Sequence, residues 1–122
     1  MAGIAEDTMF EGMLRTIKYA LCTNGKKPAK EFIESLSRKK QIQLIVLLER
    51  MATAGKISNP QKFSHLREKI YEFKSGQIRI LCFQEGIAWV LTHGFIKKQN
   101  KTPRREIDKA EAIMYEYLGK NG

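Results

Sequence analysis

The residues most able to do chemistry gather in the stretch from Leu91 to Glu106, which reads LTHGFIKKQNKTPRRE. It opens as the end of an apolar strand and continues as a loop carrying Lys97, Lys98 and Lys101. It closes at Thr102-Pro103, a pair typical of a helix start. Positive side chains beside a helix N-terminus can hold a phosphate group from several sides. The alternative is a solvated basic loop at the end of a strand.

Three apolar runs before this loop predict two hairpins. The runs cover residues 68–74, 77–83 and 87–95, and the links Ser75-Gly76 and Glu85-Gly86 have the length and type of two-residue hairpin turns. Directly opposed residues in a hairpin point to the same face of the sheet. These loops would place Glu72 opposite Arg79, and Arg79 opposite Thr92.

The same pairing predicts what each face of the sheet carries. The core face collects Tyr71, Phe73, Ile78, Ile80, Cys82, Trp89, Leu91, His93 and Phe95. The other face collects Glu72, Lys74, Arg79 and Thr92 at the end nearest Lys97, and Leu81, Phe83, Ala88 and Val90 along the rest. Because this polar patch adjoins the cationic loop, we interpret patch and loop together as a site.

The charge of the chain indicates a polyanionic partner. The 122 residues include 22 Lys and Arg against 13 Asp and Glu, which gives a net charge of +9. Residues 26–50 hold seven Lys and Arg against three Glu, and residues 97–109 hold six against two acids, so each block is +4. For a small domain this basic, nucleic acid is the first candidate. The alternative is a cationic soluble protein without such a partner.

Cysteine and histidine positions give no metal-site pattern. Cys22 and Cys82 lack CxxC spacing and lie in apolar runs, so we expect small buried side chains. His65 and His93 are isolated, so no metal and no other cofactor is expected. The longest apolar run is too short to span a membrane, and the acidic N-terminus does not look like a signal peptide. The sequence therefore predicts a cytoplasmic protein with no membrane partner.

The patterns along the chain predict an α+β domain. Residues 1–12 are expected to be a loose leader, and residues 13–122 a single domain. A strand over residues 13–22 should lead to a helix over residues 26–36 and to a second helix, capped by Ser37 and ended by Gly55. In that second helix Ile42, Ile45, Leu48 and Ala52 should share the buried face. The three strand runs follow, then a helix from Pro103 with Thr102 as its N-cap.

The segment from about residue 62 to 113 resembles the RelE/ParE toxin superfamily, specifically its HigB-like, phage-associated branch. The motifs that carry this resemblance are Glu72-Phe73-Lys74, Arg79-Ile80-Leu81-Cys82-Phe83, His93-Gly94-Phe95-Ile96-Lys97-Lys98, Thr102-Pro103, Glu106 and Ala110. Lys74 stands where the branch has Arg, and the last helix lacks an Arg found there in the family. The resemblance implies a RelE-like fold: an antiparallel sheet of about four strands, two N-terminal helices on one face and a C-terminal helix.

The resemblance also implies a function. It implies the toxin of a type II toxin–antitoxin pair, which cleaves mRNA on the ribosome without a metal, by attack of a ribose 2′-OH on the adjacent phosphate. The catalytic residues would be Arg79, Lys97, Lys98, Lys74 and His93, with Glu72 in support. Lys101, Arg104, Arg105, Lys39 and Lys40 would bind the RNA. The partners would be the ribosome, mRNA and a small acidic antitoxin with a helix-turn-helix, similar to HigA.

Two other functions fit the same residues. A ParE-like member would inhibit DNA gyrase and would not cut RNA. A non-catalytic, phage-derived module would bind RNA or an acidic protein through its basic surface. The cluster of cations expected at the strand ends favours RNA cleavage, because these charges could stabilise a crowded phosphoryl group.

Overall fold

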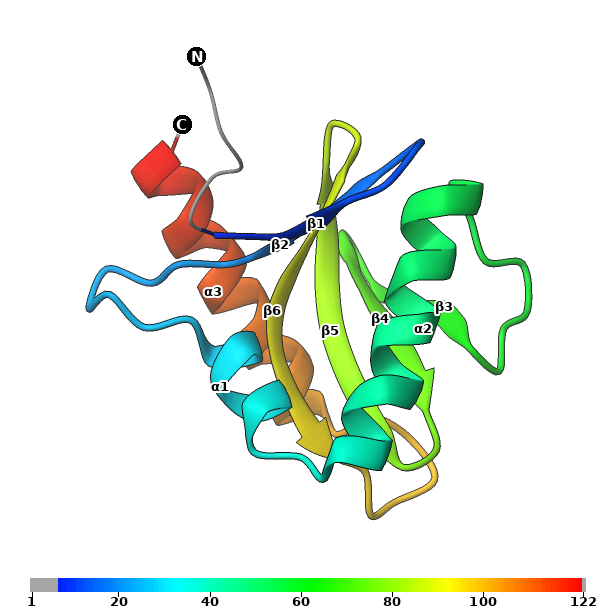
Figure 1. The fold of residues 1–122 in the computed structure, drawn as a ribbon. Coiled ribbons are helices and arrows are strands. Elements are labelled where there is room, and N and C mark those ends of the chain that lie inside the picture. Colours follow the sequence, from blue (N-terminus) through cyan, green and yellow to red (C-terminus); the bar gives the residue numbers. More distant parts are fainter. Residues whose placement is uncertain (1–6, 122) are drawn as a thin grey trace.

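The computed structural model describes residues 7–121 and confirms the α+β class. Within these residues there are three helices and one six-stranded sheet. The elements are β1 (Thr8–Glu11), β2 (Thr16–Tyr19), α1 (Pro28–Glu34), α2 (Arg38–Ala54), β3 (Phe63–Arg67), β4 (Ile70–Ser75), β5 (Ile78–Glu85), β6 (Ala88–Ile96) and α3 (Arg104–Asn121). The order across the sheet is β1-β2-β6-β5-β4-β3 (Figure 1).

The sheet differs in two ways from the predicted four antiparallel strands. It has six strands, because β1 and β3 are also present; they are only four and five residues long, too short for a clear alternating pattern. It is also mixed, because β2 pairs with β6 in parallel. Strand β1 falls inside the expected loose leader, which is therefore wrong for residues 8–11, while residues 1–6 lie outside the described residues.

The helices form as their end signals predicted. Pro28 is the first residue of α1, and the Ser37 hydroxyl accepts a hydrogen bond from the Lys40 amide at the start of α2 (3.3 Å). Gly55 ends α2 in the left-handed conformation, with φ of 86°. The tip of the β1–β2 hairpin packs against this end, where the amides of Leu14 and Arg15 both donate to the Ala52 carbonyl.

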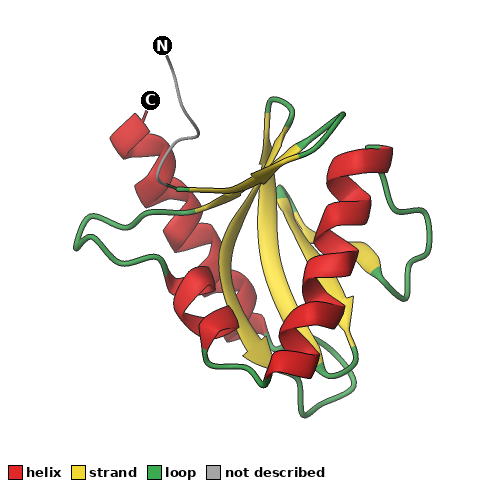
Figure 2. Ribbon diagram, in the orientation of Figure 1, coloured by secondary structure: helices red, strands yellow, loops and turns green. Residues whose placement is uncertain are grey.

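Helices cover both faces of the sheet (Figure 2). As predicted, α1 and α2 pack on one face, where Leu44, Leu48 and Met51 meet sheet residues such as Phe73 and Trp89. Helix α3 packs on the other face, against Leu81, Phe83 and Val90. Those three side chains, which the sequence placed along the face that carries the polar patch, are therefore buried. Within the described residues, no helix is long and apolar enough to cross a membrane.

Both hairpin loops begin one residue later than predicted. Ser75 pairs with Ile78 and Glu85 with Ala88, so the loops are Gly76-Gln77 and Gly86-Ile87. Each glycine has φ near 60° and takes the first loop position, as in a type II′ turn. A shift of one residue in each loop keeps side chains on their predicted faces but changes their partners. Lys74 now pairs with Arg79, and Glu72 pairs with Leu81 instead of Arg79.

A bulge in β6 changes the predicted faces of its last residues. Cys82 pairs with Leu91 and Leu81 pairs with His93, which leaves Thr92 as the extra residue. His93 and Phe95 therefore face α3, where the sequence pattern placed them on the opposite face. Gly94 instead faces α1: a Cβ at this position would lie 2.3 Å from the Phe32 ring.

Helix α3 is positioned by an edge strand and by its own first turn. The Arg67 guanidinium of β3 donates to Asp108 (2.6 Å) and Glu111 (2.7 Å) on α3. The helix begins at Arg104, and the carbonyl of Pro103 accepts from the Glu106 amide (3.0 Å). Thr102 was expected to cap this helix, but its hydroxyl donates to a side chain of β4. That bond belongs to the candidate site.

Candidate functional site

A cavity of about 310 Å³ lies where β4, the linker after β6 (residues 97–103) and the start of α3 meet. It takes polar side chains from residues far apart in the sequence. Its lining comprises Leu66, Glu72, Lys74, Lys97, Asn100, Lys101, Thr102 and Ile107. We call it the lysine cleft. It brings together four of the site residues predicted from the sequence, Glu72, Lys74, Lys97 and Lys101, and includes one acid among three cations.

Glu72 is the buried anion of the lysine cleft. The residue is 4% exposed, and its Oε1 accepts a hydrogen bond from the Thr102 hydroxyl (2.7 Å). Lys74 Nζ lies 3.9 Å from Oε2, and Arg79 Nε lies 3.9 Å from Oε1. A buried carboxylate is costly unless it is paired and hydrogen-bonded. These three partners therefore allow Glu72 to stay buried at the cleft wall, with Oε2 facing a single cation.

Lys74 is held between the lysine cleft and the segment that precedes β3. Its Nζ donates to the carbonyl of Pro60 (2.9 Å), and its backbone amide donates to the carbonyl of Lys62 (2.8 Å). The ammonium group thus has one neutral acceptor and one carboxylate nearby. Both fix its position, so its charge is presented at the cleft without a large loss of side-chain freedom on binding an anion.

Arg79 supports the site from beneath instead of lining it. The residue is 8% exposed, and Nη1 donates to the carbonyls of Gly76 (2.7 Å) and Ile78 (2.9 Å). Its Nε, which has no hydrogen-bond partner among the described residues, lies beside Glu72. The family resemblance implied that Arg79 is a catalytic residue. The structure places it behind Glu72 and across the base of the β4–β5 turn.

A second cavity, of about 270 Å³, lies on the other side of the linker. Its lining includes Phe95, Lys98, Pro103, Arg105 and Glu106. We call it the Glu106 cleft. Lys97 and Lys98, adjacent in sequence, thus face different cavities. The family resemblance implied a catalytic role for both lysines, whereas the structure places them at separate cavities.

His93 is inside the protein and is connected to the Glu106 cleft by its contact with Glu106. The residue is 2% exposed. Its Nε2 lies 2.9 Å from Glu106 Oε1, and its Nδ1 lies 3.2 Å from the Thr92 hydroxyl. Burial lowers the pKa of His93, and the Glu106 hydrogen bond partly opposes that shift. The Thr92 hydroxyl also donates to the Leu81 carbonyl (3.1 Å), so each ring nitrogen of His93 has a polar neighbour that is itself held in place or lies at the start of α3.

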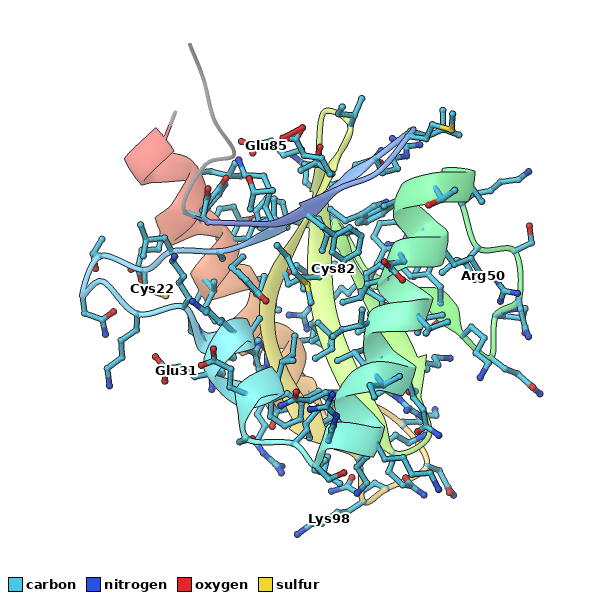
Figure 3. All side chains as sticks on the ribbon, in the orientation of Figure 1. Cys22, Glu31, Arg50, Cys82, Glu85 and Lys98 are labelled. Atoms are coloured by element: carbon cyan, nitrogen blue, oxygen red, sulfur yellow. The ribbon has the colours of Figure 1, made fainter. Side chains whose placement is uncertain are left out.

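The remaining predicted residues lie near these cavities at one end of the molecule. Lys39 and Lys40 are exposed in the first turn of α2, and Arg104 and Arg105 are exposed in the first turn of α3. The start of α2, the β4–β5 turn and the linker all lie at the lower end of Figure 1. Lys98 projects from that end in Figure 3, opposite the end that carries Glu85.

Sequence reasoning missed three contributors to the two clefts. Thr102 binds Glu72 instead of capping α3, Asn100 lines the lysine cleft, and Glu106 binds His93. The only sequence signal for these was the spacing of Thr102-Pro103 and Glu106 after the lysines. Within residues 7–121, no three His, Cys, Asp or Glu side chains are grouped as metal ligands. Cys82 is buried as predicted, and Cys22 is half-buried.

The chain was also compared with known proteins. Residues 31–115 match the model of a family described as Phage derived protein Gp49-like (DUF891). No protein of the curated collection matches the chain. The matched segment begins in α1, ends in α3 and contains every residue of the two clefts. Because it covers more than half of the chain, the protein belongs to the Gp49-like family of phage-derived proteins.

Proposed function

We propose that this protein is the toxin of a type II toxin–antitoxin module and that it cleaves mRNA on the ribosome. The observation that carries this proposal is the lysine cleft, in which a buried carboxylate, Glu72, lies among Lys74, Lys97 and Lys101. Membership of a phage-derived family and the resemblance of these motifs to RelE/ParE toxins support it. The proposed reaction uses these side chains and no metal.

The reaction begins with a proton transfer from RNA to Glu72. The carboxylate takes the proton of a ribose 2′-OH, and the 2′ oxygen attacks the adjacent phosphorus. The bond between phosphorus and the 5′ oxygen breaks, and that oxygen takes a proton from the ammonium of Lys74. The products are a 2′,3′-cyclic phosphate and a 5′-OH. General acid–base catalysis of this kind contributes about 10²–10⁴-fold to the rate.

Lys97 and Lys101 stabilise the charge that develops on the phosphoryl oxygens. Both line the cleft with Glu72, so a phosphate bound there meets cations before and during the reaction. Loss of one such fixed donor costs about 10²–10³-fold in rate. Arg79 and His93 are positioning residues in this proposal. Arg79 holds Glu72 and the β4–β5 turn, and His93 holds Glu106 at the start of α3.

The proposal is tested with single-residue variants of the protein, each added to purified, translating ribosomes. Glu72→Gln keeps the size of the side chain but removes the base, so mRNA cleavage should fall by about 10² or more. Lys97→Ala should cost more activity than Lys98→Ala, because of these two lysines only Lys97 lines the cavity that contains Glu72. Lys30→Ala, which alters an exposed lysine of α1, is the control and should cleave as the parent does.

The products are read by mapping the 5′ ends of cleaved messages, and the fold of each variant is checked by circular dichroism. If folded Glu72→Gln protein cleaves as fast as the parent, the lysine cleft is not the catalytic site. Intact mRNA with arrested DNA replication would replace the proposal with gyrase inhibition. If free RNA is cleaved at the same rate as translated RNA, cleavage does not depend on the ribosome and that part of the proposal is wrong.

A further inference from the structure

A groove runs along α2 and is separate from the two clefts. A cavity of about 510 Å³ lies between α2 and the β4–β5 turn. A smaller one of about 200 Å³ continues it, since both are lined by Val46, Leu47 and Lys62. We call the pair the α2 groove. Nothing in the proposed reaction uses its floor.

The floor of the α2 groove is apolar, and two of its side chains lie outside the core. Ile42 is 51% exposed and Val46 is 59% exposed, one helical turn apart on α2. The core takes the other side of the same helix, where Leu44, Leu48 and Met51 are buried. Exposed apolar side chains in a row at helical spacing, beside a hollow, are typical of a surface that binds another protein segment.

The rim of the groove is positive. Arg50, Lys62 and Lys74 line it, and no Asp or Glu is among the described residues that line either cavity. Glu49 is next to Arg50 in the sequence but does not line the groove. A partner segment that buries apolar side chains on Ile42 and Val46 therefore gains most if its flanking residues are acidic.

We infer that the α2 groove is the docking site for an acidic, amphipathic helix of a partner protein. RNA fits this surface less well, because none of the described residues that line it is aromatic and could stack on a base, and its floor is aliphatic. A second copy of this chain also fits poorly. A dimer formed through the groove would place two positive rims close together, and each chain has a net charge of +9, so the two copies would repel each other.

Occupation of the groove acts on the lysine cleft through Lys74. This residue lines both hollows, and its Nζ lies between the Pro60 carbonyl and Glu72. A partner carboxylate that pairs with Lys74 withdraws that cation from an RNA phosphate in the cleft. The partner is thereby an inhibitor of RNA binding. This second step rests on the proposed function, whereas docking in the groove does not.

Docking is tested with a designed helical peptide, labelled with a fluorophore, that has leucines on one face and glutamates on the other. Fluorescence anisotropy should show saturable binding to the full chain. The double variant Ile42→Gln/Val46→Gln should bind about tenfold more weakly or worse, because two apolar contacts are lost. Arg50→Gln/Lys62→Gln should weaken binding and reduce its salt dependence. Tyr115→Gln, which removes an exposed aromatic residue on α3, is the matched control and should bind normally.

Several results would overturn the inference. One is absence of binding, and another is equal binding of a peptide in which lysines replace the glutamates. Displacement of the peptide from the Glu72→Gln/Lys74→Gln variant by single-stranded RNA would assign the groove to RNA. A dimer of the free protein that Ile42→Gln/Val46→Gln dissociates would assign it to a second copy. Peptide binding with no mRNA cleavage would reject the proposed function alone, and cleavage with no peptide binding would reject this inference alone.

Discussion

At the scale of residues, the polar side chains buried within the described chain are concentrated on three strands. They are Glu72, Arg79, Thr92 and His93, on β4, β5 and β6. Glu72 and His93 each reach the linker or the start of α3, through Thr102 and Glu106. Burying such groups costs about 1–3 kcal/mol each if a partner is lost. The hydrogen bonds that offset this cost for Glu72 and His93 therefore also hold the linker and the start of α3 in position.

Protonation of His93 should destabilise the fold in acid. The pKa of His93 is lower in the folded protein than its ordinary value of 6.5, because the ring is buried. Between these two values the unfolded chain binds more protons than the folded one, so the free energy of unfolding should fall as the pH drops below about 6.5. Urea titrations between pH 7.5 and 5 on the parent and on His93→Gln measure this dependence.

The free energy of unfolding should depend less on pH in His93→Gln than in the parent. His65→Gln, a change at an exposed position, should show the same pH dependence as the parent. An identical pH dependence of the parent and His93→Gln would show that His93 does not contribute to acid destabilisation.

At the scale of elements, β6 decides which residues reach which face. Up to Leu91 its alternation is regular, and after the bulge at Thr92 the order of faces is reversed. The sequence predicts the strand and its end because the apolar run is long and stops at the lysines. It does not predict the bulge, because LTHGF alternates equally well with or without an extra residue. His93 was therefore assigned to the wrong face.

The ends of helix α2 could be predicted from the sequence, but its buried face could be predicted only in part. Its caps, Ser37 and Gly55, were predicted from local chemistry and are confirmed. Its buried face was only partly predicted, since Leu48 and Ala52 are buried but Ile42 is exposed. The helix is apolar on two sides, so periodicity alone cannot decide which side meets the sheet. The site residues were predicted as types and positions, while their division between two clefts depends on the linker path, which no local pattern specifies.

The close contact between β6 and α1 should make Gly94 sensitive to any side chain. A Cβ there would lie 2.3 Å from the ring of Phe32, which is partly buried against the core, and 2.6 Å from Ile80, which is in the core. Gly94→Ala should therefore lower the free energy of unfolding by roughly 1–3 kcal/mol, as overpacking does. Gly119→Ala, in α3 with nothing near its Cβ, is the control and should be neutral or slightly stabilising. Denaturant unfolding of both variants measures the difference, and equal stabilities would contradict the packing argument.

At the scale of the whole molecule, positive charge from distant segments meets at one end. The linker is joined to the β4–β5 turn, where the Lys97 amide donates to the Gln77 carbonyl (2.8 Å). The start of α2 lies at the same end (Figure 1). The basic blocks 26–50 and 97–109 are therefore partly united, as a surface that could receive RNA on one side of Lys74 and an acidic protein on the other.

RNA binding at this end should depend steeply on salt. For the cleavage-deficient Glu72→Gln protein, the logarithm of the association constant for a single-stranded RNA should fall linearly with the logarithm of salt concentration. Each phosphate contact contributes about 0.7 to the slope. Lys97→Gln and Lys101→Gln should each reduce the slope by about this amount, and Lys30→Gln should leave it unchanged. Filter binding over a range of salt concentrations measures this slope. If neither Lys97→Gln nor Lys101→Gln changes the slope, the RNA does not bind at the lysine cleft.

The parallel pairing of β2 with β6 sets when the fold that carries the proposed site can be completed during synthesis of the chain. Thr16 must find Ala88, and Tyr19 must find Leu91, so the N-terminal hairpin cannot join the sheet until β6 has been made. The lysine cleft forms later still, because the Thr102 hydroxyl that donates to Glu72 lies in the segment after β6. A nascent chain stalled or truncated before that point lacks the cleft. The topology thus delays formation of the proposed site until the segment that contains Thr102 has been synthesised.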